Sequence, residues 1–413
     1  MRVCVVGRGG REHALADVLG RSADVVVTPG NPGIPGSTSA GPEEIDADLF
    51  VIGPEAPLVA GLADRLRTAG RLVFGPGADG AHLEGSKAWM KEVVAEAGVP
   101  TAAHGAFDAV GPALDFLRQM SGPYVVKTDG LAAGKGVLVT ESLIEAEDDV
   151  KAKLSGVLFG DAGRTVLIEE GLTGAELSVL AVCDGTRAVA LAPAQDFKRI
   201  GDHDAGPNTG GMGAYSPVPV AGPALVDEVI DRFVEPTLAR LRRDGIDYRG
   251  VLYAGLMLTP TGPKLLEYNV RFGDPEAQVV LPRLAPDFDL AAMLAEAADG
   301  ALRSEPRFVD DAAVGVVVAS PGYPGAPRLG GIVEGVDACA SLPGVSVYCA
   351  GVDRNPDGLL MSAGGRVLNV VGVAPSIAAA RVRAYAGVRM IGLPGMQYRH
   401  DIASRAAREE VPS

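Results

Sequence analysis

The chain has 413 residues, of which 37 are Lys or Arg and 52 are Asp or Glu, giving a formal net charge of -15. A single hydrophobic core rarely fills this length, so we expect about two to four domains. The composition, 47% apolar and 22% charged, is that of a globular protein and excludes a disordered chain. The acidic charge argues against nucleic acid as a partner, because that needs a basic face, but it does not restrict a small anionic ligand in one pocket.

Four cysteines lie far apart in the sequence, at Cys4, Cys183, Cys339 and Cys349. Their spacing fits neither a disulfide framework nor a zinc or redox motif, so we expect small buried hydrophobic residues. A strand-like run begins directly after Met1, without a targeting sequence, and the most apolar stretch, 312–319, is too short to cross a bilayer. We therefore expect a cytoplasmic protein without a membrane partner.

Short β-branched runs alternate with helical patterns over the first hundred residues, which predicts a parallel sheet with helices on its faces. The expected strands cover 3–6, 25–27, 49–52 and 72–74. The expected helices cover 11–19, 58–69 and 86–97. Gly98-Val99-Pro100 ends the last helix, so we expect a doubly wound α/β domain over residues 1–100.

The pattern then changes to α+β, which predicts a domain over 101–304 with an inserted lid lobe at about 122–187. Its expected strands cover 124–127, 137–140, 166–169, 177–183, 188–192, 251–258 and 264–272, with a helix over 225–243. A smaller β-rich α+β domain is expected over 305–413. It would hold strands 314–319, 345–349 and 367–373 and a helix over 376–388.

A glycine-rich loop over residues 7–13, GRGGREH, follows the first strand and opens the first helix. That context favours phosphate binding by backbone N–H groups and the helix dipole. A dinucleotide is disfavoured, because Glu12 stands where the fingerprint needs a third glycine and Thr28-Pro29 where it needs an acidic residue. We expect a single phosphate with Arg8 or Arg11 nearby, the alternative being a tight turn that needs glycine for packing.

A second glycine-rich stretch, VVKTDGLAAGKGV over 125–137, resembles a P-loop, but its glycine spacing differs and a strand follows it. A glycine loop between two strands can fold over a polyphosphate. Lys135 would supply charge from the loop and Lys127 from the strand. The alternative is a surface hairpin that merely needs glycine.

The strand expected over 264–272 carries polar residues at alternate positions. Period two places Glu267, Asn269 and Arg271 on one face. The other face would carry Leu266, Tyr268 and Val270. Carboxylate and amide oxygens side by side suit Mg²⁺, and Arg271 could reach the same phosphates. An exposed polar sheet face is the alternative.

Residues 195–213 are polar and glycine-rich, so we expect a long loop without structure of its own. Basic and acidic residues together suit a loop that closes over a charged substrate. Simple mobility is the alternative.

With these motifs in this order, the chain resembles the ATP-grasp superfamily and, within it, the phosphoribosylamine–glycine ligases of purine synthesis. The resemblance runs from residue 7 to the end of the chain. Its most specific pieces are GPEAPL from Gly53, LEGSKAWMK from Leu83, VKTDGLAAGKGV from Val126, GPNTGGMGAYSP from Gly206 and RFGDPEAQ from Arg271.

The resemblance implies a monomer that uses ATP with Mg²⁺ or Mn²⁺ and joins glycine to 5-phosphoribosylamine through a glycyl acyl phosphate. It implies ATP binding by Lys87, Lys127, Gly134, Lys135, Glu169, Glu170, Leu172 and Glu176, with Glu169, Glu170 and Leu172 near adenine. It implies metal binding by Glu267 and Asn269, and catalytic roles for Arg271, Lys135, Lys198 and Asp196. The implied substrate residues are Gly9, Gly10, Arg11, Glu55, Asp196, Gly210, Gly211, Asp274, Pro275 and Glu276.

Two residues depart from the family pattern: Phe197 stands where many members carry His, and His203 replaces a frequent Gly. Three other functions stay open on the sequence alone. They are another ATP-grasp carboxylate–amine ligase or biotin-carboxylase-like enzyme, a nucleotide-binding protein without turnover, and a nicotinamide dehydrogenase, against which Glu12 and Thr28 already weigh.

Overall fold

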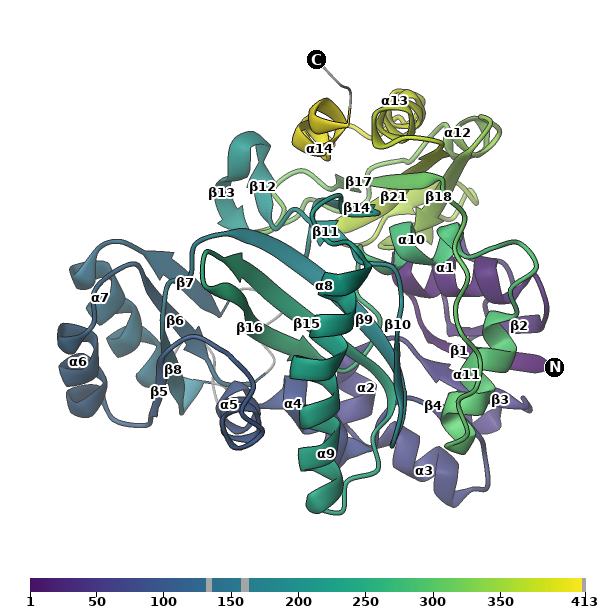
Figure 1. Ribbon diagram of the computed structural model, residues 1–413. Helices are drawn as coiled ribbons and strands as arrows, with labels where there is room; N and C mark the ends of the chain where they lie inside the picture. The colour runs from purple at the N-terminus through teal and green to yellow at the C-terminus, as the bar shows by residue number, and fades with distance from the viewer. Residues whose placement is uncertain (131–135, 157–162, 411–413) are drawn as a thin grey trace.

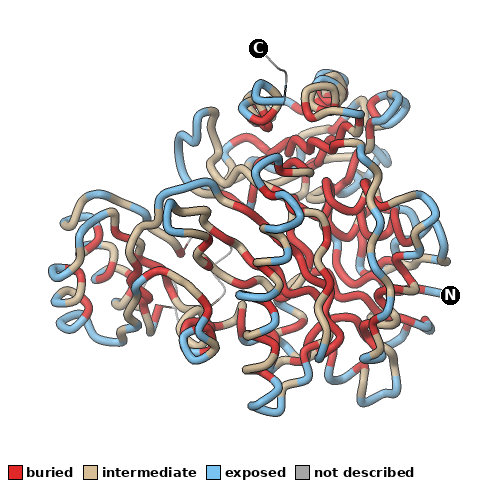
Figure 2. The backbone as a smooth tube through the Cα atoms, in the orientation of Figure 1, coloured by how far each residue is buried: buried red, intermediate tan, exposed pale blue. Residues whose placement is uncertain are grey.

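The computed structural model describes residues 1–130, 136–156 and 163–410 (Figure 1). Its buried backbone is concentrated in the sheets of the main body, and its exposed backbone lies in the surrounding helices and loops (Figure 2). None of the described helices is both long and apolar enough to cross a membrane. All four cysteines are free and buried, as expected.

The N-terminal sheet is parallel, with strand order β2-β1-β3-β4, which confirms the expected α/β pattern. Its strands are β1 (Arg2–Gly7), β2 (Asp24–Pro29), β3 (Leu49–Ile52) and β4 (Val73–Phe74). The accompanying helices are α1 (Gly10–Leu19), α2 (Glu55–Val59), α3 (Leu62–Thr68) and α4 (Ala78–Gly85). The helix expected over 58–69 is thus interrupted, because Gly61 adopts a left-handed φ of 74°. Helix α4 was not expected.

A small lobe projects from the main body with a sheet of order β5-β8-β6-β7 (Figure 1). It holds β5 (His104–Phe107), α6 (Val110–Gln119), β6 (Tyr124–Thr128), β7 (Val137–Thr140), α7 (Leu143–Leu154) and β8 (Val166–Glu170). Leu117, Val126, Val150 and Ile168 form part of its separate core. The lobe's sheet and helices therefore lie within residues 104–170, whereas the expected range was 122–187, because the next strand pairs with the central sheet instead. The remaining domain boundaries stay predictions.

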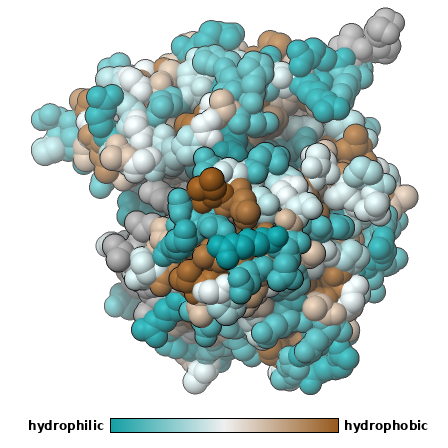
Figure 3. All heavy atoms as spheres, turned by 90° about the vertical axis from the view of Figure 1, so that its left-hand side faces the viewer, coloured by the Kyte–Doolittle hydropathy of each residue, from teal (hydrophilic) through white to brown (hydrophobic). Residues whose placement is uncertain are grey.

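Figure 3 views the molecule from the side of this lobe. The surface there is mostly hydrophilic, with hydrophobic residues gathered near the middle of the view. Three large hydrophobic residues of the lobe are exposed: Val110, Val139 and Ile144.

The central sheet is antiparallel, with order β10-β9-β15-β16. Its strands are β9 (Ala175–Asp184), β10 (Ala188–Ala190), β15 (Arg249–Thr259) and β16 (Gly262–Asn269). Helices α5 (Lys87–Glu96), α8 (Pro223–Val229) and α9 (Glu235–Arg243) lie beside it. The helix expected over 225–243 is present, but a π-helical turn over Ile230–Val234 separates α8 from α9 just before Pro236, which lacks a backbone N–H.

The C-terminal sheet has order β11-β14-β17-β21-β18. Its strands are β11 (Gln195–Asp196), β14 (Gly213–Ser216), β17 (Ala312–Ala319), β18 (Val345–Cys349) and β21 (Arg366–Ala374). Two hairpins accompany it: β12 (Arg199–Gly201) with β13 (Ala205–Asn208), and β19 (Val352–Arg354) with β20 (Leu360–Ser362). The remaining helices are α10 (Ala277–Val280), α11 (Leu290–Asp299), α12 (Val336–Ala340), α13 (Ile377–Val388) and α14 (Ser404–Glu409).

The segment 195–213 corrects one expectation, since it is not a loop without structure of its own. It contains β11 and the β12–β13 hairpin, and Met212 is fully buried. Strand β17 is buried along its whole length and pairs with β14 immediately after this segment. Backbone pairing thus satisfies the segment's N–H and C=O groups, while its polar side chains remain free to line a cavity.

His13 joins helix α1 to the C-terminal sheet. Its Nδ1 accepts a hydrogen bond from the Cys349 N–H at 2.8 Å, so this nitrogen must be unprotonated. Burial lowers the pKa of His13 to about 4, although Asp17 partly offsets the effect. The neutral imidazole is therefore part of the native contact.

Protonation of His13 should destabilise the native protein. Because the folded-state pKa lies below the unfolded value, stability should fall as the pH drops from about 6.5 to about 4, by up to about 3 kcal/mol. His13→Asn keeps an acceptor but cannot titrate, so it should weaken this loss. Urea unfolding between pH 7 and 4 measures the difference, and identical pH slopes for the two proteins would contradict the assignment.

Candidate active site

A cleft of about 1270 Å³ lies among the small lobe, the central sheet and the N- and C-terminal parts. The predicted residues that line it are Arg11, Glu55, Lys87, Lys127, Glu169, Glu170, Leu172, Glu176, Asp196, Lys198, Gly210, Glu267, Asn269, Arg271, Asp274 and Glu276. Gly9, Gly10, Gly211 and Pro275 are not part of this lining. Gly134 and Lys135 lie outside the described residues. The fold thus gathers into one cavity segments that are far apart in the sequence.

One end of the cleft is rich in lysine. Lys127 on β6 lies with its Nζ 3.1 Å from Glu169 Oε2 on β8. Lys87, at the start of α5, donates to the Gly130 carbonyl at 3.0 Å. Burial lowers the pKa of Lys87, although Glu267 partly offsets the effect. Strands β6 and β7 pair antiparallel, so the two strands that flank the predicted glycine-rich stretch are neighbours in the sheet.

Glu169, which was expected near adenine, is engaged by two lysines. Its carboxylate is buried between Lys127 and Lys91, whose Nζ lies 3.2 Å from Glu169 Oε1. This ion pairing favours a role in orienting lysine over direct contact with a base. Glu170 is likewise engaged, since it pairs with Lys264 at 2.9 Å, whereas Leu172 lines the cleft.

Glu267 and Asn269 lie close together on β16, as expected for an oxygen-rich metal site. Burial alone would raise the pKa of Glu267, but the positive charges of Lys127 and Lys198 hold this pKa below its ordinary value. Within the described part of the chain, no hydrogen bond or ion pair occupies this carboxylate. A carboxylate and an amide oxygen fit Mg²⁺, which takes the rest of its shell from water and phosphate oxygens.

The alternation along β16 is broken by a β-bulge. Gly255 pairs with Glu267 but Leu256 pairs with Leu265, so Leu266 is left out of the register. Leu266 consequently lines the cleft beside Glu267, instead of lying on the opposite face as expected. Side chains therefore do not alternate strictly between the two faces of β16 here, because the bulge adds one residue to this strand.

Acidic and basic side chains meet at the centre of the cleft. Lys198 lies 3.1 Å from Asp196 Oδ1 and also pairs with Glu176. Burial raises the pKa of Asp196, although Lys198 partly offsets the effect. Burial would lower the pKa of Lys198, yet Asp196 and Glu176 hold it well above its ordinary value. Lys198 is therefore a fixed positive charge between two carboxylates.

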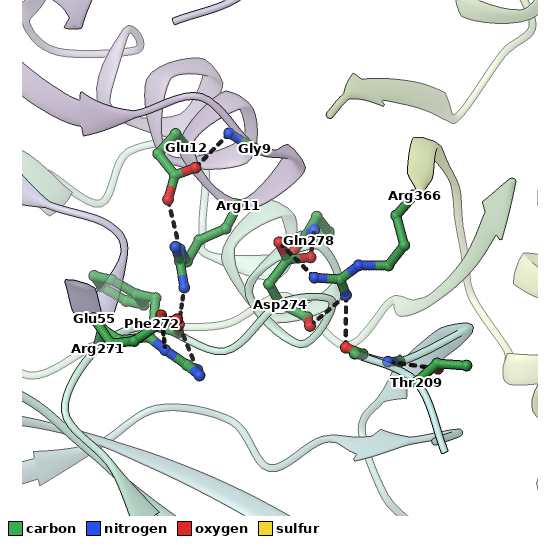
Figure 4. A network of polar contacts seen from close by, with 12 residues as sticks. Gly9, Arg11, Glu12, Glu55, Thr209, Arg271, Phe272, Asp274, Gln278 and Arg366 are labelled. Atoms are coloured by element: carbon green, nitrogen blue, oxygen red, sulfur yellow. Dashed lines mark hydrogen bonds and ion pairs between the residues drawn. The ribbon is translucent and has the colours of Figure 1, made fainter. Parts of the chain in front are cut away.

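Arg271 is held by groups from three segments, and Figure 4 shows it beside Glu55. Its Nε lies 3.3 Å from Glu55 Oε2, and its Nη2 lies 2.8 Å from Glu84 Oε1 and 3.0 Å from Asn269 Oδ1. Burial would lower the pKa of Arg271, yet Glu84 and Glu55 raise it. The guanidinium therefore remains charged in a fixed orientation.

Sequence reasoning missed Glu84, which holds Arg271 and also accepts the Val270 N–H at 2.8 Å. Glu84 lies near the C-terminal end of α4, where the helix dipole disfavours an anion. Because helix α4 was not expected, this position could not be recognised from the sequence, and the only signal was an acidic residue within the motif LEGSKAWMK.

The N-terminal loop is filled by its own helix. Glu12 accepts the Gly9 N–H at 2.5 Å and pairs with Arg11 at 2.6 Å. An added Cβ at Gly53 would lie 2.7 Å from the Glu12 carboxyl carbon. This buried carboxylate excludes a dinucleotide phosphate from the loop by charge and by volume. The Gly9 N–H already donates to Glu12, and Gly10 is buried; neither residue is part of the cleft lining, and their substrate roles stay predictions.

A second arginine, Arg366, comes from the C-terminal sheet (Figure 4), and sequence reasoning missed it. Arg366 on β21 pairs with Asp274 Oδ2 at 3.2 Å and donates to the Gly210 carbonyl at 2.6 Å. Gln278 donates to Asp274 Oδ1 at 2.7 Å, so both oxygens of this carboxylate are engaged. The structure therefore favours a positioning role for Asp274. Gly211 packs so closely against Pro275 that an added Cβ would overlap the proline side chain.

The two departures from the family pattern have local partners. The Phe197 ring lies under the Arg399 guanidinium, with 4.9 Å between Cζ and the ring centroid. His203 adopts a left-handed φ of 57°, a conformation that favours glycine. Asp401 accepts the His203 N–H at 2.9 Å and helps to hold this turn.

Family models of phosphoribosylglycinamide synthetase match most of the chain. The N domain matches residues 1–84, the ATP-grasp (A) domain residues 85–277 and the C domain residues 313–405. The chain belongs to the phosphoribosylglycinamide synthetase family. The resemblance inferred from the sequence motifs is thereby confirmed, as is the ATP-grasp fold.

Curated relatives cover nearly the full length. A phosphoribosylamine–glycine ligase of Streptomyces coelicolor is 48% identical, with 98% of this chain and 100% of that protein aligned. One of Brucella melitensis is 44% identical, with 99% of each aligned. Both relatives thus align with this chain over nearly the whole of their own length.

Solved structures agree with the family. The phosphoribosylamine–glycine ligase of Thermotoga maritima superposes with a TM-score of 0.85 at 35% identity, covering 98% of this chain and 100% of that one. The biotin carboxylase domain of Hydrogenobacter thermophilus 2-oxoglutarate carboxylase, solved with MgADP, ADP and bicarbonate, has a TM-score of 0.69 at 17% identity, covering 96% and 91%. The second likeness extends to the fold alone.

The filled N-terminal loop predicts the effect of a substitution at Gly53. Gly53→Ala should displace the Glu12 carboxylate and lower the free energy of unfolding by about 1–3 kcal/mol, because Glu12 is held by Gly9 and Arg11. Gly111→Ala is the control, since open space surrounds Gly111 in α6 and alanine should stabilise that helix by up to about 1 kcal/mol. Urea unfolding tests both. Equal stability of Gly53→Ala and the unchanged protein would show that Glu12 moves freely.

Proposed function

We infer that the chain is an ATP-dependent ligase that joins glycine to 5-phosphoribosylamine, forming glycinamide ribonucleotide, ADP and phosphate for purine biosynthesis. The observation that carries this function is that Lys127, Glu267 and Arg271 line one and the same cleft in a member of the family. The cleft needs no protein nucleophile for this reaction. Its groups position the substrates and neutralise charge.

The lysine-rich end of the cleft is proposed to bind ATP. Lys87 and Lys127 would contact its phosphate groups, and Leu172 would lie beside adenine. Glu267 and Asn269 would hold Mg²⁺ or Mn²⁺, which when bound neutralises phosphate charge. Among the described residues, none forms a hydrogen bond or ion pair with the Glu267 carboxylate, and its pKa is lowered; both support this assignment, because a metal ligand must be available and ionised.

Ligation is proposed to occur in two displacements. A carboxylate oxygen of glycine forms a bond to the γ-phosphorus of ATP, and the bond to ADP breaks, giving glycyl phosphate. The amine nitrogen of 5-phosphoribosylamine then bonds to the acyl carbon, phosphate leaves and the amine loses a proton. Arg271 is fixed where it can neutralise the transferring phosphoryl group. The carboxylates of Asp196 and Glu276 suit the ammonium group of glycine.

The expected monomeric state and cytoplasmic location stay predictions. A biotin-carboxylase-like activity is disfavoured, since those structures share the fold at low identity only.

A coupled assay of ADP release tests the proposed function. The purified protein should release ADP and phosphate only when glycine, 5-phosphoribosylamine and MgATP are all present, and mass spectrometry should detect glycinamide ribonucleotide. Bicarbonate in place of glycine should be inactive. Release of ADP that depends on bicarbonate but not on glycine would overturn the proposal.

The metal assignment predicts the behaviour of Glu267→Gln. Loss of the charged ligand should lower kcat by about 100-fold or more, with little change in melting temperature, because the side chain lines a cleft and fills no core. Glu92→Gln, an exposed change on α5, should leave kcat unchanged. If Glu267→Gln retained near-normal turnover at saturating Mg²⁺, the residue would not be a metal ligand.

A further inference from the structure

Lys91 on α5 is a buried lysine to which neither the sequence motifs nor the proposed mechanism gives a role. Its side chain is 1% exposed, and its Nζ lies 2.6 Å from Thr101 Oγ1 and 3.2 Å from Glu169 Oε1. Burying an ammonium group is costly unless it is paired and hydrogen-bonded. Lys91 meets this condition, because it donates a hydrogen bond to Thr101 and pairs with Glu169. The Glu169 carboxylate, however, is shared with Lys127.

The shared carboxylate leaves a net positive charge. Glu169 lies between Lys91 and Lys127, so one negative charge faces two ammonium groups. The cluster therefore carries one surplus positive charge. Lys127 lines the cleft, whereas Lys91 lies behind Glu169. A phosphate group in the cleft can therefore meet the surplus positive charge only at Lys127.

The same cluster spans the β-bulge that carries the proposed metal ligand. The Thr101 hydroxyl donates to the Leu265 carbonyl at 2.7 Å, and Lys127 Nζ lies 3.5 Å from the Leu266 carbonyl. Both carbonyls flank the bulge directly before Glu267. Lys91 therefore links α5, the small lobe and β16 through Thr101 and Glu169.

We propose that Lys91 is a positioning residue for nucleotide binding. By occupying one oxygen of Glu169 it keeps Lys127 incompletely neutralised and directed toward the phosphates of a nucleoside polyphosphate. Without Lys91, Glu169 and Lys127 would form a neutral pair that competes with the phosphates. This inference rests on the proposed ATP-binding function.

The environment of Lys91 makes this role sensitive to pH. Burial lowers the pKa of Lys91 to about 8, although Glu169 partly offsets the effect. The charged groups that face it are Glu169 from β8, Lys127 from β6 and Glu267 from β16. Loss of the Lys91 proton would leave the neutral Glu169–Lys127 pair, so the dissociation constant for ADP should rise above about pH 8.

Calorimetric titration of the full-length protein with MgADP tests the inference. Lys91→Met should raise the Kd for MgADP by about tenfold or more, because one unit of nearby charge is lost from the phosphate site. Lys91→Met with Glu169→Gln restores the single surplus charge and should bring the Kd back toward that of the unchanged protein. A merely structural role for Lys91 would instead make the double variant weaker than Lys91→Met.

Lys153→Met is the matched control. Lys153 is a similarly buried lysine, 2% exposed, which pairs with Asp149 within α7 and does not line the cleft. Its replacement should leave the Kd for MgADP unchanged. If Lys91→Met bound MgADP as tightly as the unchanged protein, or if the double variant bound more weakly still, the inference would be overturned.

A second variant keeps the test decisive if Lys91→Met folds poorly. Thr101→Val preserves shape but removes one hydrogen-bond acceptor of Lys91, so the rise in Kd should begin at lower pH. A Kd that stayed constant between pH 7 and 9.5 in the unchanged protein would also contradict the inference. Failure of the unchanged protein to bind MgADP at all would instead overturn the nucleotide site itself.

Discussion

The structure depends on ion pairs that hold positively charged side chains in the cleft of an acidic chain, where anionic substrates would bind. Lys127, Lys198 and Arg271 each line the cleft, and each is paired with carboxylates from another segment. Such pairing offsets the cost of burial and fixes each cation in one orientation. The net charge of -15 is therefore no measure of the charge that a substrate meets. Nucleoside and phosphoribosyl phosphates would encounter a local concentration of ammonium and guanidinium groups.

These pairs also join the parts of the fold. Arg271 contacts Glu55 and Glu84 from the N-terminal part, and Arg366 brings the C-terminal sheet onto Asp274. Lys127 reaches from the small lobe to the Leu266 carbonyl of the central sheet. Movement of any part would thus alter the geometry of the cleft, which makes substrate positioning a property of the whole molecule.

The sequence predicts the parallel N-terminal sheet and the strands of the central sheet, and most of the predicted site residues line the cleft, because alternation and glycine-rich motifs are local signals. It did not predict the lysine partners of Glu169 or the acidic partners of Arg271, which come from α2, α4, α5 and β6 and meet only after folding. The bulge at Leu266 escaped the period-two pattern, since nothing in Leu265-Leu266 marks an inserted residue. The sequence predicts a loop over 195–213 because its residues are polar. In the structure these side chains line the cleft, while the backbone of the segment hydrogen-bonds to β17.

The central claim is that these paired cations form a site for a nucleoside polyphosphate, with Glu169 shared between two lysines. A crystal structure with a nonhydrolysable ATP analogue, Mg²⁺ and glycine tests it most directly. The account predicts phosphates at Lys87 and Lys127, the metal at Glu267 and Asn269, and Glu169 still between Lys91 and Lys127. Phosphates bound away from these lysines, or a Glu169 carboxylate turned onto adenine, would contradict it.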